Sequence, residues 1–277
     1  MKKCIVFLLI IVVFNSCKHQ QKGFKNSNVN KPIVLISKDF NKTHQNWLRK
    51  SIGNDNVVCV NMYAIKSKDS LRMMLKKADG IIISGGEDVN PSLYGKQKEL
   101  NRCGIINSHR DSLEYMMIAF AMNRKIPLLG ICRGLQILNV SQGGSLIIDI
   151  PTDVGSKYLH RDSRKALEHK STAVYHEVYI QKGTYLHNIV KVDSGIAYSN
   201  HHQAIEKVAP FFKISSFAKD KVAESFELAD TLRHPFVLGV QWHPEAIKVK
   251  NPLSGTIARK FMGKVEEHLK TKYIKNL

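Results

Sequence analysis

Short continuous apolar runs alternate with amphipathic stretches through the first half of the chain. Apolar runs of this length are typical of buried parallel strands. Four of them are predicted to be strands, at residues 32–37, 56–62, 79–86 and 126–131. The stretches between and after them have helical periodicity, at residues 43–53, 67–78, 110–125 and 133–142. Strands that alternate with helices in this way predict a parallel sheet covered on both faces.

The pattern changes beyond Pro151. Residues 152–172 are polar and loop-like, and the segments that follow alternate as β-strands do, with little helix between them. The expected strands are at residues 173–181, 212–218, 222–229 and 236–245, and a terminal helix is expected at 254–271. We therefore expect one α/β domain over residues 32–277, with a mostly parallel central sheet and an antiparallel β extension.

The N-terminus has the layout of a secretory signal. Lys2 and Lys3 precede eleven residues, 4–14, that lack charge and are apolar, which is too short to span a bilayer. The run stops close to Cys17, and this resembles a bacterial lipoprotein signal. The division is then a signal peptide at 1–16 and a flexible tether at 17–31, with Cys17 lipidated. The chain would be exported and anchored by lipid to a bacterial membrane, facing the periplasm; plain secretion or an uncleaved anchor are the alternatives.

Composition adds little to this picture. The formal net charge is +19 over 277 residues, but the basic residues are spread along the chain, so charge assigns no nucleic-acid partner. After removal of the signal and lipidation, three cysteines remain. Export would permit a Cys59–Cys103 disulfide, although their spacing does not require one. The sequence makes no prediction about oligomeric state.

The third remaining cysteine, Cys132, lies in the stretch GICRG, where a predicted strand meets a predicted helix. A strand, a tight turn flanked by glycines and a helix form a nucleophile elbow. Gly130 and Gly134 would provide the clearance, and the helix dipole would favour the thiolate. A buried structural cysteine is the simpler alternative for this motif taken alone.

Two further motifs can supply what a nucleophilic cysteine needs. In GVQWHPE, His243 and Glu245 lie two residues apart, on one face of an extended chain, and can act as base and orienting acceptor. In ISGGEDVNP, the N–H of Gly86 can join that of Arg133, the residue after the cysteine, as an oxyanion hole. A surface His–Glu pair and an ordinary turn are the alternatives.

These motifs occur in an order that resembles the class I glutamine amidotransferase superfamily, in its γ-glutamyl-γ-aminobutyrate hydrolase branch of cysteine peptidases. The resemblance rests on ISGGEDVNPSLYG, RDSLE, PLLGICRGLQILNV, SNHHQAI and GVQWHPE. It implies a flavodoxin-like three-layer sandwich, no cofactor and a Cys132–His243–Glu245 triad with Gly86 and Arg133 as oxyanion donors. The residues that it implies for substrate binding are Gln136, His202 and Gln203.

The predicted function is hydrolysis of the amide bond of a small γ-glutamyl compound through a cysteine thioester. A γ-glutamyl peptidase acting on cell-wall peptides, an inert binding lipoprotein and a surface protein that binds through its basic charge are the alternatives. Arg110, Asp111 and Glu114 either flank the pocket or only cap and pair along a helix.

No metal site is predicted. Neither H-E-x-x-H nor paired C-x-x-C occurs, and the adjacent His201 and His202 would point in opposite directions on a strand.

Overall fold

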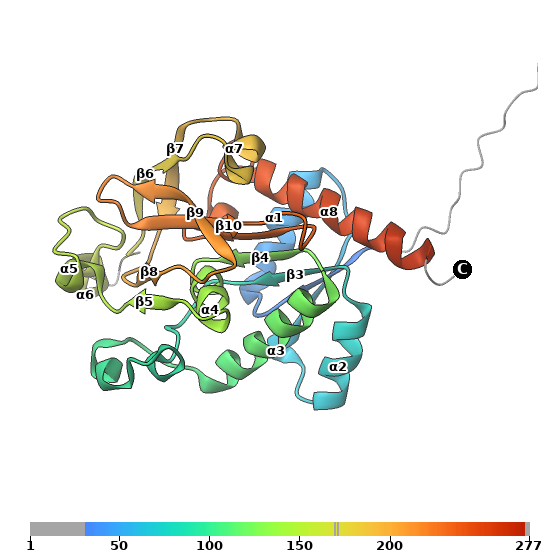
Figure 1. The fold of residues 1–277 in the computed structure, drawn as a ribbon, viewed down its shortest axis with the longest axis horizontal. Helices are drawn as coiled ribbons and strands as arrows, with labels where there is room; N and C mark the ends of the chain where they lie inside the picture. Colours follow the sequence, from blue (N-terminus) through green and yellow to red (C-terminus); the bar gives the residue numbers. More distant parts are fainter. Residues whose placement is uncertain (1–30, 169, 171, 275–277) are drawn as a thin grey trace, which may run out of the picture. The chain divides into compact units, whose positions relative to one another are not determined.

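Nine strands form one sheet in the computed structural model, which describes residues 31–168, 170 and 172–274 (Figure 1). The strand order is β2-β1-β3-β4-β11-β10-β9-β6-β7. Its first five strands pair in parallel. They are β2 (Val58–Asn61), β1 (Ile33–Ile36), β3 (Gly80–Ile83), β4 (Leu128–Ile131) and β11 (Val237–Val240). The predicted parallel sheet is confirmed, and β11, which was expected among the strands after Pro151, joins it as a fifth parallel strand.

The remaining four strands extend the same sheet with antiparallel pairs. They are β10 (Ala223–Leu228), β9 (Phe212–Ala218), β6 (Val174–Ile180) and β7 (Ser194–Ser199). The predicted antiparallel extension is therefore present. A separate pair joins β5 (Ser145–Ile147) to β8 (Ala204–Lys207).

Helices cover both faces of the sheet, as Figure 1 shows. On one face α2 (Lys68–Lys77), α3 (Ser108–Arg124) and α4 (Arg133–Ser141) enclose an apolar core with β-strand residues such as Ile81 and Ile83. On the other, α1 (Thr43–Ile52), α7 (Tyr185–Val190) and α8 (Gly255–Ile274) enclose a second core around Ile82. This is the expected three-layer sandwich.

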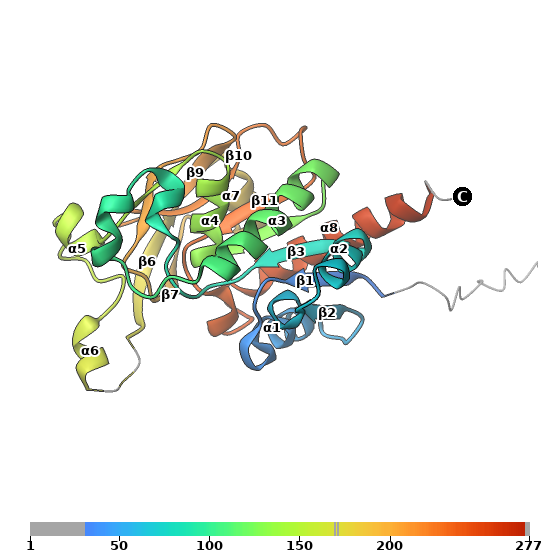
Figure 2. The same cartoon turned by 90° about the horizontal axis from the view of Figure 1, so that it is seen from below.

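Short helical segments connect these elements. The rotated view in Figure 2 shows α5 (Ile150–Asp153) and α6 (Ser163–Leu167) at the end of the domain away from α2. The 3-10 helices are η1 (Phe40–Lys42), η2 (Met62–Ala64), η3 (Pro91–Tyr94), η4 (Gln97–Arg102) and η5 (Pro244–Ala246). No described helix is both long enough and apolar enough to cross a membrane.

The sequence did not predict α7, β7 or β8. Helix α7 has six residues and is capped by Thr184, whose hydroxyl accepts a hydrogen bond from the N–H of His187 at 3.1 Å. β7 is only partly buried, and β8 has four residues of which two are exposed. The predicted signal peptide (1–16), Cys17 and the tether up to residue 30 lie outside the described residues. Cys59 and Cys103, which are described, are free thiols.

Candidate active site

Cys132 occupies a strained turn between β4 and α4. Its φ of 52° and ψ of −111° lie in a region that residues with a Cβ rarely adopt. The turn is held by the Cys132 N–H, which donates to the Val240 carbonyl oxygen at 2.8 Å. A Cβ on Gly134 would lie 1.9 Å from the Ile83 carbonyl oxygen, and one on Gly130 would lie 2.8 Å from that of Gly134. The two glycines provide the clearance that the sequence predicted.

His243 lies beside Cys132 because β11 and β4 are neighbours. Gly239 pairs with Gly130 and Val240 with Ile131, so the residues after the two strands share one edge of the sheet. A Cβ on Gly85 would lie 2.7 Å from His243 Cε1 and 3.5 Å from Cys132 Cβ. The two side chains thus meet over Gly85.

Glu245 orients the imidazole. Its Oε1 lies 2.7 Å from Nδ1 of His243. Burial alone would lower the pKa of His243, but attraction and hydrogen bonding from Cys132 and Glu245 raise that pKa well above its usual value. Burial acts to raise the pKa of Glu245, yet the charges of His243 and His44 and the hydrogen bond from His243 lower it to about 2. These surroundings therefore favour an imidazolium at His243, held between the Glu245 carboxylate and the sulfur of Cys132.

A second histidine backs Glu245. Nε2 of His44, on α1, lies 3.7 Å from Glu245 Oε1, and its Nδ1 lies 3.1 Å from Oδ1 of Asp39. The Asp39 carboxylate also accepts the N–H of His44 at 2.9 Å. Sequence reasoning missed this pair, because Asp39 and His44 precede Glu245 by some 200 residues and carry no recognisable motif.

The predicted oxyanion loop follows β3. Gly86 has a φ of 151°, and a Cβ there would lie 1.9 Å from Arg110 Nη1, so this position requires glycine. Arg110, which is completely buried, donates from Nη2 to the carbonyl oxygens of Ser84 and Gly85 at 3.0 and 2.7 Å. Holding both carbonyls on the Arg110 side fixes the orientation of the peptide units next to Gly86.

The backbone and the side chain of Arg133 have separate roles. It is the first residue of α4, where a backbone N–H has no partner within the helix. Its buried guanidinium donates to Asp111 Oδ1 at 2.6 Å and to Glu114. Glu114 also accepts from Nε of Arg110 at 2.8 Å. The RDSLE motif is thus a buried ion network that links the oxyanion loop to the elbow helix, and surface pairing is excluded.

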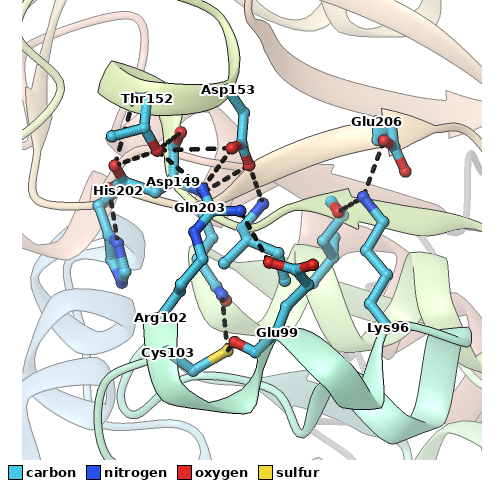
Figure 3. A network of polar contacts seen from close by, with 12 residues as sticks. Lys96, Glu99, Arg102, Cys103, Asp149, Thr152, Asp153, His202, Gln203 and Glu206 are labelled. Carbon is cyan, nitrogen blue, oxygen red and sulfur yellow. Dashed lines mark hydrogen bonds and ion pairs between the residues drawn. The ribbon is translucent and has the colours of Figure 1, made fainter.

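The expected substrate residues Gln136 and Gln203 lie together. The Gln136 amide donates to the Gln203 carbonyl oxygen at 3.1 Å and to Gln241 Oε1 at 3.3 Å. The Gln203 amide in turn contacts the sulfur of Cys103 at 3.7 Å (Figure 3). Its Oε1 is buried without a hydrogen-bond partner among the described residues, so this oxygen can accept one from a ligand.

His202 is placed differently from its expected role. Nε2 lies 3.0 Å from Asp88 Oδ2 and Nδ1 lies 3.2 Å from Asp149 Oδ1. Figure 3 shows Asp149 beside Thr152 and Asp153, in a polar network that continues to Arg102. With both ring nitrogens bonded to carboxylates, His202 joins loops around the site and has no nitrogen left for substrate.

A surface pocket opens beside the imidazole. Its lining includes Lys38, Phe40, Gly85, Glu87 and His243. Lys38 forms an ion pair with Glu87. Through this pocket a ligand can reach His243 from the solvent.

Comparison with known proteins gives consistent matches. The sequence profile of the family Peptidase C26 matches residues 31–245, which include Cys132, His243 and Glu245. The γ-glutamyl-γ-aminobutyrate hydrolase of Escherichia coli K12 is 31% identical over 212 residues, covering 76% of this chain and 81% of that protein.

Two solved structures share the fold. The glutaminase domain of Trypanosoma brucei CTPS has a TM-score of 0.55 and 16% identity, covering 85% of this chain and 94% of that one. A glutamine amidotransferase from Thermotoga maritima has a TM-score of 0.53 and 14% identity, covering 87% and 86%.

Proposed function

The chain belongs to the peptidase C26 family, and on that premise we propose that it hydrolyses the γ-amide bond of a small γ-glutamyl compound through a thioester on Cys132. Family membership makes it an amide-bond hydrolase. The observation that carries the residue assignment is the meeting of Cys132 and His243 over Gly85, at the carboxyl ends of two adjacent parallel strands.

In the acylation step the Cys132 thiolate attacks the γ-carbonyl carbon, and the carbonyl electrons move to oxygen. The backbone N–H groups of Gly86 and Arg133 donate to that oxyanion, and such a donor typically contributes about 3 kcal/mol to the transition state. As the C–N bond breaks, the His243 imidazolium gives its proton to the departing amine. The product is a γ-glutamyl thioester and a neutral imidazole.

In the second step the neutral His243 takes a proton from water, and the water oxygen attacks the thioester carbonyl. The same two N–H groups hold the second oxyanion. The C–S bond then breaks, which releases glutamate and restores the thiolate and imidazolium. Glu245 keeps the ring in one orientation throughout.

The glutamyl end of the substrate would lie on the α4 side of the sulfur. Gln136 donates to the Gln203 carbonyl oxygen there, and the unpartnered Oε1 of Gln203 suits an ammonium donor. The amine leaving group would then lie toward the pocket walled by Lys38 and Glu87.

The test is a panel of γ-glutamyl conjugates with the full chain: γ-glutamyl-GABA, γ-glutamyl dipeptides and muropeptides, with Cys132→Ala as control. We expect glutamate release from the small conjugates and none with Cys132→Ala. Turnover of muropeptides alone would favour the cell-wall peptidase instead. A Cys132 that reacts with iodoacetamide no faster than free cysteine would support an inert binding protein and contradict the proposal.

We further propose that the enzyme is exported and tethered to a membrane by lipid on Cys17. The basic start, the short apolar run and the position of the cysteine support this. Labelling cells with a radioactive fatty acid should mark the wild-type protein and not Cys17→Ser, with Cys59→Ser as matched control. Equal labelling of wild type and Cys17→Ser would contradict the lipid anchor.

A further inference from the structure

Three histidines and a glutamate converge in the domain, outside the triad. They come from four segments: His160 from the loop before α6, His176 from β6, His201 from the loop after β7 and Glu224 from β10. Their exposures are 3%, 5%, 4% and 0%. One atom from each lies within 4.8 Å of the other three.

In each histidine, the outer ring nitrogen, which faces away from Glu224, lies next to an oxygen atom, and this contact shows which ring nitrogen carries the proton. Nδ1 of His176 lies 3.2 Å from the Glu177 carbonyl oxygen, and Nδ1 of His201 lies 3.0 Å from that of Gln203. Nε2 of His160 lies 3.1 Å from Asp220 Oδ2. These oxygens only accept hydrogen bonds, so each outer nitrogen must hold the proton. In a neutral ring the inner nitrogen is then a bare lone pair.

The inner atoms are therefore four acceptors that face one another in a buried space. They are Nδ1 of His160, Nε2 of His176, Nε2 of His201 and Oε1 of Glu224, and none has a hydrogen-bond partner within the described part of the chain. Converging lone pairs around a carboxylate repel one another, and burial makes the arrangement costly. A cation at their centre would remove that cost.

The distances from the carboxylate to the three imidazoles are close to those between neighbouring ligands of one zinc ion. Glu224 Oε1 lies 3.1, 3.5 and 3.5 Å from the inner nitrogens of His160, His176 and His201. Tetrahedral zinc, with bonds of about 2.0–2.1 Å, places neighbouring ligand atoms about 3.3 Å apart. Ligands of one ion aim at a shared point and not at each other, which also explains why these contacts fail as hydrogen bonds.

We propose that His160, His176, His201 and Glu224 bind one divalent transition-metal ion, for which Zn²⁺ is the best match. Three imidazoles and one carboxylate suit zinc, and four protein ligands make a closed, structural site. Outer nitrogens that donate to carbonyl and carboxylate oxygens are the surroundings usual for metal-binding histidines. The ligands come from four segments without a fixed spacing, so no sequence motif marks them.

The ion would fix the loop that follows β7. The N–H of His201 and the hydroxyl of Ser199 donate to the His160 carbonyl oxygen at 3.2 and 2.8 Å, so the two ligand-bearing loops already touch. The next two residues contact the active-site surroundings: His202 pairs with Asp88, and the Gln203 carbonyl oxygen accepts a hydrogen bond from Gln136. A surface pocket lined by His160 and His201 gives an ion a route in.

The experiment measures metal on the purified full chain. After stripping with a chelator, the protein is dialysed against Co²⁺ or Zn²⁺ and analysed by elemental analysis, absorption spectroscopy and thermal melting. We expect one ion per chain, visible d–d bands of tetrahedral Co²⁺ that Zn²⁺ abolishes, and a melting temperature that rises with metal.

Two variants serve as controls and one tests the ligands. His234→Asn alters another buried histidine, which contacts the Ala121 carbonyl oxygen, and should retain the ion. Cys132→Ala should also retain it, because the active-site thiol lies outside the cluster. His201→Asn should lose the Co²⁺ bands.

Wild-type protein that takes up neither ion would overturn the proposal, and this result does not depend on any variant folding. Loss of the ion in Cys132→Ala would also overturn it, because the metal would then belong to the active site. The amidase assay is independent of both outcomes, since a hydrolase without this ion is still a hydrolase.

Discussion

At the scale of the residue, the site depends on two charges that stabilise each other across a buried contact. His243 lies between the sulfur of Cys132 and the carboxylate of Glu245. Both neighbours favour the protonated imidazole, and the imidazole favours the ionised Glu245. The folded pKa of His243 is raised and that of Glu245 is lowered. The pair should therefore contribute to stability as well as to catalysis, within a definite pH range.

Replacing Glu245 by glutamine should reveal that range. The pKa of Glu245 is lowered from 4.5 to about 2, so its stabilisation of the folded state is complete above pH 4.5 and is lost as the pH falls toward 2. The pKa of His243 is raised above 6.5, so its stabilisation is complete below pH 6.5 and is lost as the pH rises through the folded-state pKa.

The free energy of unfolding of the wild type should thus exceed that of Glu245→Gln most between pH 4.5 and 6.5, by on the order of 3 kcal/mol. Urea unfolding of both proteins across pH 3.5–9 measures the difference. A gap that does not change with pH would show that the glutamate acts by packing alone.

At the scale of the element, the helix that carries the nucleophile is packed directly on the oxyanion strand. A Cβ on Gly134 would overlap the Ile83 carbonyl oxygen, and neither backbone atom can move without shifting α4 or β3. The buried Arg110–Glu114–Arg133 network also ties α4 through α3 to the segment that follows β3, because Arg110 donates to the Ser84 carbonyl oxygen. The position of the sulfur relative to Gly86 is therefore fixed by both packing and charge.

Gly134→Ala should separate α4 from β3 and lower both stability and activity, with destabilisation of about 1–3 kcal/mol from overpacking. Gly263→Ala is the matched control, because Gly263 lies in α8 with no atom within 4 Å of its added Cβ. That change should be neutral or stabilising by up to about 1 kcal/mol. Thermal melting of both variants measures the difference in stability. Equal melting temperatures would contradict the close approach of Gly134 to the Ile83 carbonyl oxygen.

Arg110→Lys should lower kcat by about 10- to 100-fold, with little change in KM. Lysine keeps the charge but cannot hold the Ser84 and Gly85 carbonyls with one planar group. Arg124→Lys, at the exposed end of the same helix, is the control and should behave as wild type. Steady-state kinetics on the best γ-glutamyl conjugate separates the two; a KM effect alone would assign Arg110 to substrate binding.

The sequence could predict β1, β3 and β4 as parallel strands because they are almost completely buried and read as unbroken apolar runs. Segments such as SGIAYS (194–199) could not be recognised, since that strand is partly exposed and contains Gly195. The same contrast holds at the site. Cys132, His243 and Glu245 lie in short local motifs, whereas the His44–Asp39 pair behind Glu245 acquires its meaning only from residues distant in the chain.

At the scale of the whole molecule, His202 ties together three loops that surround the active site. Its partners Asp88 and Asp149 come from the segment after β3 and from the segment before α5, and Asp88 also accepts the N–H of Gly104 at 2.7 Å. This clamp determines how the walls of the proposed substrate site are spaced.

His202→Ala should leave Asp88 and Asp149 without their shared partner and loosen those loops. We expect KM to rise about tenfold, with a smaller change in kcat, because the reacting groups keep their supports. His187→Ala removes a His–Asp pair on α7 and should leave both constants unchanged. A kcat effect without a KM effect would place His202 in the chemistry instead.

The neighbouring strands β4 and β11 end at residues 131 and 240 of a chain that is synthesised from its N-terminus. The sulfur-bearing turn therefore leaves the ribosome about a hundred residues before the imidazole that must activate it. Until the last parallel strand inserts beside β4, the thiol has no partner and the polypeptide is inert toward amides. An unfinished chain that ends before β11 therefore carries the cysteine without the histidine and the glutamate that complete the site.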